Sequence, residues 1–307
     1  MKLIPLAAAL LPLLAAPLAT IAPPQQAARP GILLLAHGGN PQWNDNVLAI
    51  ARAVDVVHPT EVAFGMATRA NIQAAADKLA ARGATEIVAV PLFVSSHSSV
   101  VRATEFLLGL RAEAPPELAR FAEMAHGSQA AGHGANAHAG HGAADGVDGT
   151  HPVATALPIR ITPALNSHPL LGAIVADRAR SISTDPSRES VILVAHGPVG
   201  DEDNARWLAD LGALSGHVNG YASVDVLSLR DDAPAPVRDA ATADLRGKVR
   251  AARAAGRDVL IVPVLLSYGG IERGLRTRLE GLEYRLPAQG IAPDARLAQW
   301  VGEAARK

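Results

Sequence analysis

The 307-residue chain contains no cysteine. Without cysteine it has no disulfide bond, no thiolate zinc site, no iron–sulfur cluster and no cysteine-linked lipid. A metal ion bound to this chain therefore depends on histidine, carboxylate or backbone oxygen. A charge excess is also missing, since 28 lysines and arginines are balanced by 29 aspartates and glutamates. This balance favours neither nucleic acid nor an anionic membrane as a partner.

The N-terminus carries a long apolar run. Lys2 precedes an almost unbroken run from Leu3 to Ala22, and a small and polar stretch follows. This pattern is typical of a secretory signal, so we expect residues 1–28 to be a signal peptide with a linker and the protein to be periplasmic. The alternative is an uncleaved signal that anchors the chain in the membrane, but three prolines within the run disfavour a spanning helix.

Beyond Pro30, short apolar runs alternate with segments of helical periodicity. The runs predict strands over residues 31–36, 61–66, 86–94 and 157–163. Between them we expect a helix capped by Asn44 or Asp45, a helical segment after Asn71, a helix over 100–112, and a helix that opens at Pro169. Strands and helices in this alternation predict an α/β fold with a doubly wound parallel sheet.

The same order then recurs. Residues 190–195 lead into His196-Gly197 as residues 32–36 lead into His37-Gly38, and 257–266 repeats the pattern of 86–94, including its proline. In this second copy Gly269 stands where His97 stood. We therefore predict two homologous halves, about 31–185 and 188–307, of which only the first keeps both histidines.

A compositional break interrupts the first half at residues 125–151. The stretch from Ala125 to Thr150 is rich in glycine, alanine and histidine and has almost no large apolar residue, so we expect it to remain outside the core. Clustered histidines of this kind bind zinc, nickel, cobalt or copper. A low-complexity linker with incidental histidines is the alternative interpretation.

Two histidines are the candidate site residues. His37 and His97 each directly follow a predicted strand, and in an open α/β sheet ligands bind at the carboxyl ends of the strands. Neutral imidazole both holds a divalent ion and accepts protons near neutral pH. Gly38 and Gly39 would allow a flat ligand to approach the backbone. The structural alternatives are a polar strand terminus for His37 and a helix cap or surface residue for His97.

The other candidates carry weaker signals. His168 is expected to be a helix cap or a buried structural residue, and His196 a relic of the duplication rather than a ligand. A hydrolase built on Ser95 and Ser96 is disfavoured because the chain has no G-x-S-x-G motif. A phosphate-binding loop after residue 37 is disfavoured because G-x-G-x-x-G and the P-loop lysine are both missing.

Five motifs together resemble the class II tetrapyrrole chelatases, the sirohydrochlorin cobaltochelatase and ferrochelatase group. They are LLLAHGG (33–39), VPLFVSSH (90–97), ITPALNSHPLL (161–171), VILVAHG (191–197) and VPVLLSYGG (262–270). The resemblance implies two tandem flavodoxin-like domains that face each other across a cleft, with His37 and His97 as both catalytic and metal-binding residues. The chain departs from the family pattern at Asn40-Pro41, in its export signal and in the histidine-rich insert.

The resemblance implies a lyase-class enzyme of cobalamin or related tetrapyrrole biosynthesis. Such an enzyme inserts cobalt, nickel or iron, as a divalent ion, into sirohydrochlorin or a related tetrapyrrole and needs no organic cofactor. Arg69, Arg102, Arg230 and Arg273 are candidate partners for the substrate carboxylates. The alternative function is an exported, non-catalytic protein that binds divalent metals.

Overall fold

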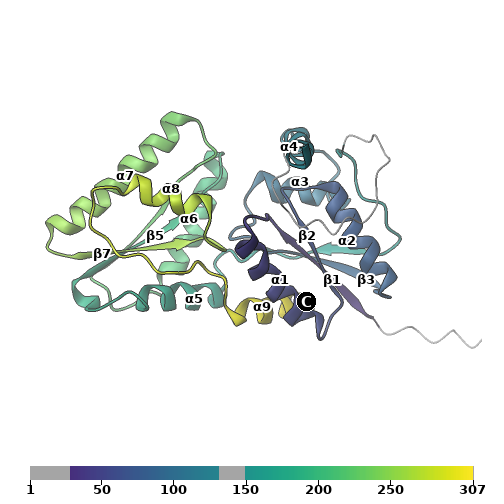
Figure 1. Ribbon diagram of the computed structural model, residues 1–307, viewed down its shortest axis with the longest axis horizontal. Helices are drawn as coiled ribbons and strands as arrows, with labels where there is room; N and C mark the ends of the chain where they lie inside the picture. Colours follow the sequence, from purple (N-terminus) through teal and green to yellow (C-terminus); the bar gives the residue numbers. More distant parts are fainter. Residues whose placement is uncertain (1–27, 131–148, 307) are drawn as a thin grey trace, which may run out of the picture.

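The computed structural model describes residues 28–130 and 149–306, which form two parallel sheets that lie next to each other (Figure 1). The first sheet has the order β2-β1-β3-β4, with β1 (Pro30–Ala36), β2 (Thr60–Phe64), β3 (Glu86–Pro91) and β4 (Ile159–Ile161). The second has the order β6-β5-β7, with β5 (Glu189–Ala195), β6 (Ser223–Ser228) and β7 (Asp258–Val264). The predicted α/β fold with parallel sheets is confirmed.

The two sheets share strand order and register. Pro91 of β3 lies opposite Leu35 of β1, and Pro263 of β7 lies opposite Val194 of β5. The glycines that follow the two central strands, Gly38 and Gly197, both have a positive φ, of 83° and 75°. The interpretation as tandem flavodoxin-like domains stays a prediction, and so do its boundaries.

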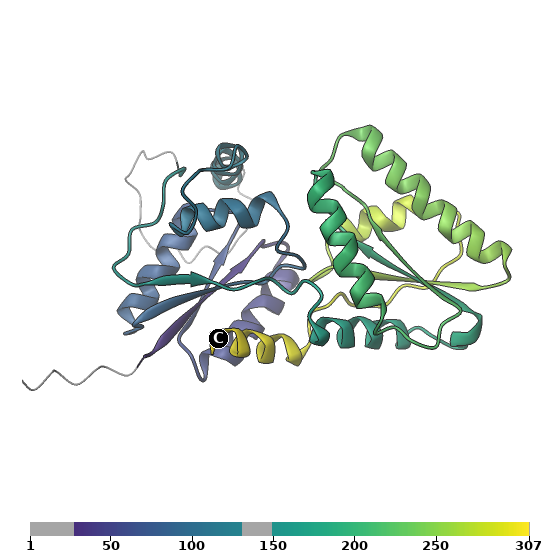
Figure 2. The same ribbon diagram turned by 180° about the vertical axis from the view of Figure 1, so that it is seen from behind.

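Helices cover both faces of each sheet (Figures 1 and 2). On the first sheet, α1 (Pro41–Asp55) and α9 (Ala295–Ala305) cover one face, and α2 (Arg69–Ala81), α3 (Ser99–Leu107) and α4 (Leu118–Ala130) cover the other. On the second sheet, α5 (Pro169–Arg180) and α6 (Asp201–Ser215) lie opposite α7 (Ala235–Ala254) and α8 (Gly270–Arg278). A 3₁₀ turn at Pro186–Arg188 precedes β5.

The halves exchange helices. The helix α5, which precedes the predicted boundary near residue 185, packs against β7 and α6 of the second sheet. The C-terminal helix α9 crosses in the opposite direction and packs against α1 and β3. A continuous cluster of buried apolar residues consequently extends beneath both sheets. Spatially, the division between the halves therefore differs from the division along the sequence.

Several strands and helices end at other residues than the sequence pattern predicts. The strand β3 ends at Pro91 rather than Val94, because Val94 and its neighbours bond to the segment after β4. The helix α3 ends at Leu107, and Gly109 follows it with a φ of 73°. The helix α4 extends to Ala130, so it includes the first six residues of the insert. That the insert remains outside the core stays a prediction.

The predicted signal and linker, residues 1–28, lie outside the described residues except for Ala28, and so do residues 131–148 of the histidine-rich insert. Within 28–130 and 149–306, no helix combines the length and the apolar character needed to cross a bilayer.

Candidate metal site

His37 lies directly beyond the last residue of β1. Its side chain is exposed, and its Nδ1 lies 2.7 Å from the carbonyl oxygen of Gly38. Because a carbonyl only accepts, Nδ1 is the protonated nitrogen in this contact, and Nε2 of the neutral ring carries the lone pair. Metal-binding histidines are commonly oriented in this way, with one ring N–H donated to a backbone carbonyl. The φ of Gly38, 83°, makes the turn that allows this contact and favours glycine.

The helix after His37 begins earlier than predicted. Asn40 caps α1 through a 2.8 Å hydrogen bond that its Oδ1 accepts from the backbone N–H of Trp43. The predicted caps, Asn44 and Asp45, lie inside the helix, because Pro41 occupies its first turn and needs no hydrogen-bond acceptor there. Asn44 instead accepts a hydrogen bond from the backbone N–H of Gly39.

The helix α2 also begins earlier than the sequence predicted. Thr68 rather than Asn71 precedes α2, and the Asn71 side chain donates a 2.7 Å hydrogen bond to the carbonyl of Phe64. A Cβ on Gly39 would lie 2.9 Å from the Trp43 ring, so glycine at this position leaves room for that ring. The approach of a flat ligand to the backbone at Gly38 and Gly39 stays a prediction.

His97 lies in the loop between β3 and α3. Its backbone N–H donates to Ser95 Oγ at 3.1 Å, and its carbonyl accepts a 2.6 Å hydrogen bond from the indole N–H of Trp207. The Ser95 side chain is buried. Both backbone groups of His97 are thus held in place, one of them by the helix α6 of the other half.

The segment after β4 supports the same loop. Asn166 accepts a 2.7 Å hydrogen bond from the backbone N–H of Ser96, and Ser96 Oγ accepts one from the N–H of Ala164. Asn166 itself has a φ of 46°, a conformation that asparagine tolerates better than most residues. The two serines therefore help to hold the loop in place.

The sheet topology places both histidines at one edge. The strands β1 and β3 are parallel neighbours, with Leu35 opposite Pro91, and each histidine follows the carboxyl end of its strand. Among residues 28–130 and 149–306, no group of three or more histidine, aspartate and glutamate side chains is close enough to hold an ion. That one ion bridges His37 and His97 stays a prediction.

The second half contributes groups that the sequence did not single out. Asp203 of α6 forms a salt bridge of 2.9 Å with Arg102 of α3, and Asn46 of α1 donates a 3.0 Å hydrogen bond to Ser267 after β7. Trp207 lies on the same helix as Asp203. These contacts bring α6 and the loop after β7 against the edge of the first sheet that carries the histidines.

Asp210 lies one turn beyond Trp207 on α6 and is part-buried. Burial raises the pKa of the Asp210 carboxyl, and the nearby His97 acts in the opposite direction. The Oδ2 atom of Asp210 is buried and has no hydrogen-bond partner. A sequence pattern offers no way to find this residue, because its position near His97 depends on how the two halves meet.

The four candidate arginines differ in their surroundings. Arg69 donates to the carbonyl of His151 at 3.1 Å, and Arg102 bonds to Asp203. Arg230 bonds to Asp201 at 2.6 Å. Arg273 is exposed on α8.

Two further histidines have structural contacts. His168 caps α5 through a hydrogen bond that Nδ1 accepts from Leu170 N–H at 3.2 Å, which confirms its predicted capping role. Nε2 of His196 lies 3.4 Å from Asp232 Oδ2. The absence of a ligand role for His196 stays a prediction.

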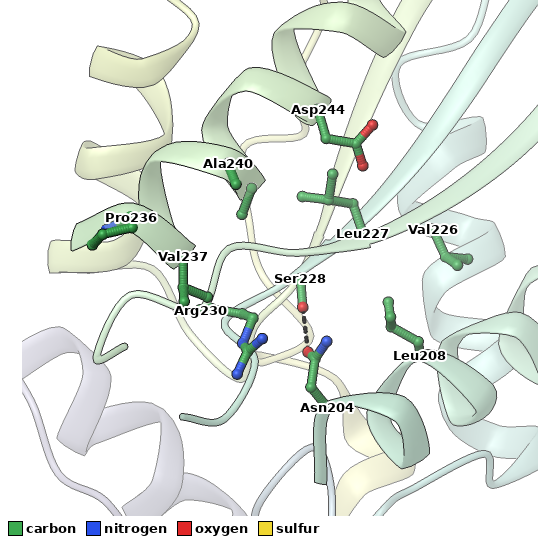
Figure 3. A pocket seen from close by; sticks show the side chains of 11 residues that line it. Asn204, Leu208, Val226, Leu227, Ser228, Arg230, Pro236, Val237, Ala240 and Asp244 are labelled. Carbon is green, nitrogen blue, oxygen red and sulfur yellow. Dashed lines mark hydrogen bonds between the residues drawn. The ribbon is translucent and has the colours of Figure 1, made fainter. Parts of the chain in front are cut away.

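A cavity of about 510 Å³ lies in the second half, and neither His37 nor His97 lines it (Figure 3). Side chains of α6, β6 and the first turns of α7 line it, including Leu208, Val226 and Val237. The hydrogen bond between Ser228 and Asn204 lies at one side of this cavity.

Two solved structures share this fold over most of their length. SirB from Bacillus subtilis with Fe³⁺ has a TM-score of 0.57 and 16% identity, and the match covers 91% of this chain and 94% of SirB. The sirohydrochlorin chelatase SirB from Bacillus subtilis subspecies spizizenii in complex with cobalt has a TM-score of 0.52 and 16% identity, with 91% and 96% covered. At this identity the similarity shows the fold.

No curated protein matches the chain in sequence. The model of the CbiX family matches residues 31–182, the segment that contains β1 to β4, α5 and both candidate histidines. Through this segment the chain belongs to the CbiX family of class II tetrapyrrole chelatases.

Proposed function

We propose that the protein inserts a divalent metal ion, cobalt, nickel or iron, into sirohydrochlorin or a related tetrapyrrole. One observation carries this proposal: the family match spans the segment in which His37 and His97 follow the carboxyl ends of neighbouring parallel strands. The similar SirB structures hold Fe³⁺ and cobalt, which supports a metal ion as substrate.

The two histidines would hold the incoming ion. In His37, the contact between Nδ1 and the Gly38 carbonyl directs Nε2 to serve as the ligand atom. The backbone N–H and carbonyl of His97 are bonded to Ser95 and Trp207, so ion binding has to order only its side chain. Two imidazoles leave coordination positions open for water and then for the macrocycle nitrogens.

The reaction exchanges protons for metal. The tetrapyrrole loses two pyrrole N–H protons as the divalent ion enters, so two protons leave for each ion inserted. A neutral imidazole near the site accepts such protons at neutral pH. In this role one histidine acts as ligand and base in turn.

Arg273 is the best placed of the candidate arginines to meet a substrate carboxylate. It is exposed, and it lies in the first turn of α8, just beyond Gly269. A Cβ on Gly269 would lie 3.9 Å from the Asn40 side chain, so this turn of α8 adjoins the loop that follows His37. A guanidinium there would bind a carboxylate in bidentate geometry.

We further propose that the chain is exported to the periplasm and that its halves are tandem flavodoxin-like repeats. The apolar run over residues 3–22 supports export, and the common strand order and register of the two sheets support the repeat. A metal-binding protein without catalysis is the second candidate, favoured by the same export signal and by the histidine-rich insert.

The test follows the visible spectrum of sirohydrochlorin on incubation with Co²⁺ and the protein, together with calorimetric titration of Co²⁺ alone. The parent should accelerate the spectral change over the protein-free rate. His37→Ala and His97→Ala should abolish the acceleration and remove the tightest metal site, because each change deletes a ligand atom.

A third variant without residues 131–148 separates the insert from the site. It should keep the tightest site and the spectral change and lose only weakly bound ions. A parent that binds Co²⁺ tightly through both histidines but leaves the spectrum at the protein-free rate would identify the non-catalytic binder. Tight binding that survives both alanine substitutions but not the deletion would refute the site.

A further inference from the structure

A hydrogen bond from the second half acts on the loop that carries His97. The indole N–H of Trp207 donates to the His97 carbonyl oxygen at 2.6 Å. Trp207 lies in the middle of α6, and its ring packs against the buried apolar cluster that extends beneath both sheets. A large side chain packed against a core has few orientations available, so its N–H is a well-fixed donor. The His97 carbonyl is therefore bound to a firm point of the other half.

The same helix also contacts the element that follows His97. Asp203 precedes Trp207 by four residues, so the two side chains share one face of α6. Asp203 forms a salt bridge of 2.9 Å with Arg102 of α3, the helix that is capped by Ser98, the residue after His97. One face of α6 thus contacts the chain both at His97 and in the helix that follows it.

The halves make a matching contact in the opposite direction. Asn46 of α1 donates a 3.0 Å hydrogen bond to Ser267, in the loop after β7. In both contacts, the helix after the first strand of one half bonds to the loop after the third strand of the other. Only one of these loops carries a histidine, because Gly269 stands in the second loop where His97 stands in the first.

We propose that Trp207 is a positioning residue for the metal site, and that its hydrogen bond makes the place of His97 depend on how the second half packs against the first. The inference rests on the proposed function, since it takes His97 as a ligand of the ion. The family match ends at residue 182, so Trp207 lies outside the segment that carries the family resemblance.

The position of the backbone matters because the distances between a metal ion and its ligand atoms vary by only about 0.2 Å in functional sites. Without the indole donor, the carbonyl of His97 loses this bond, while the N–H bond to Ser95 stays. The peptide that follows His97 then gains rotational freedom, and the ring spends less time where it can bind an ion. The apparent affinity falls in proportion to that fraction of time, although no ligand atom is lost.

The test measures Co²⁺ binding and thermal unfolding of Trp207→Phe in the full chain. Phenylalanine keeps an aromatic ring and removes the N–H donor. Co²⁺ affinity should fall by about 10-fold, the lower end of the range for groups that orient metal ligands. The visible absorption of bound Co²⁺ should also change, because the imidazole of His97 is held less firmly.

Ser267→Ala is the matched control, since it breaks the reciprocal hydrogen bond, on the loop that has no histidine. Both variants lose one hydrogen bond between the halves, so both unfolding midpoints should fall. Only Trp207→Phe should weaken Co²⁺ binding and change the spectrum. Trp207→Leu repeats the measurement without an aromatic ring and should weaken binding at least as much, whether or not the phenylalanine variant folds.

The two levels of proposal fail in different ways. If the Trp207 variants bind Co²⁺ with parental affinity and spectrum, while His97→Ala loses binding, Trp207 has no positioning role and the histidine site stands. Equal weakening in Ser267→Ala would mean that binding depends on any contact between the halves, which overturns a specific role for Trp207. If His37→Ala and His97→Ala both bind like the parent, the proposed function itself is refuted.

Discussion

Glu189 shows how a single carboxylate stabilises the second half. It begins β5, and its side chain is 1% exposed. Burial alone would raise its pKa, but hydrogen bonds from Ser183, the backbone N–H groups of Thr184 and Asp185, and Arg285 outweigh burial and lower the pKa to about 2. The carboxylate is thus stabilised in its charged form, and it ties the start of β5 to the turn that precedes it.

We expect Glu189→Gln to destabilise the fold at pH 7 by about 3 kcal/mol, the free energy of a pKa shift from 4.5 to about 2. A lowered pKa stabilises above the unfolded value, so this contribution is complete above pH 4.5 and is lost as the pH falls toward 2. Urea unfolding of parent and variant at pH 7 and pH 3 measures the difference, which should narrow at pH 3. An equal difference at both values would contradict this account.

At the scale of elements, α2 and α7 follow the edge strands of their sheets but pack differently. The helix α2 buries Ile72, Ala75, Ala76 and Leu79, whereas α7, although longer, buries only Leu245 and Val249. The first turns of α7 border the cavity between α6 and β6 (Figure 3). The helix that follows the edge strand therefore packs closely in the first half, whereas in the second half it borders a cavity.

A pair of substitutions tests this difference. Ala241→Leu on the cavity side of α7 should leave stability unchanged or raise it by up to about 1 kcal/mol, because added methylene groups gain apolar contacts. Ala76→Leu on the buried face of α2 should cost about 1–3 kcal/mol, because that face is already filled. Thermal and urea unfolding of both variants check the signs, and equal losses would show that the cavity closes in solution.

For the whole molecule, the exchange of α5 and α9 couples the halves. The helix α9 buries Leu297, Trp300 and Val301 against the first half, and Arg160 of β4 donates a hydrogen bond to the Ala305 carbonyl at 2.8 Å. Each half therefore completes its core with a helix that is distant in sequence. This arrangement links the folding of the two sheets.

We expect Trp300→Ala to cost about 3–5 kcal/mol, as a large aromatic side chain that is 5% exposed leaves a cavity. Calorimetry should record a single unfolding transition in the parent and in the variant, with the midpoint lowered. Two separate transitions in the parent would show that the halves unfold independently despite the exchanged helices.

Local pattern was sufficient for the sheets and for the edge at which the histidines lie. Continuous apolar runs placed β1 over 31–36, where the strand spans 30–36, and the parallel order then placed His37 and His97 beyond neighbouring carboxyl ends. Helix starts were less well predicted. Several polar residues compete for each cap, and Pro41 rather than Asn44 decided where α1 begins.

Sequence alone determined the α/β alternation, the paired motifs and the two histidines, because apolar periodicity and strand-end positions are properties of short segments. Only the tertiary structure placed Trp207 on the His97 carbonyl, set Asp210 near His97, and exchanged α5 with α9. The physical reason is that these contacts join residues far apart in the chain. They depend on how the two halves pack against each other, and no short sequence pattern specifies that packing.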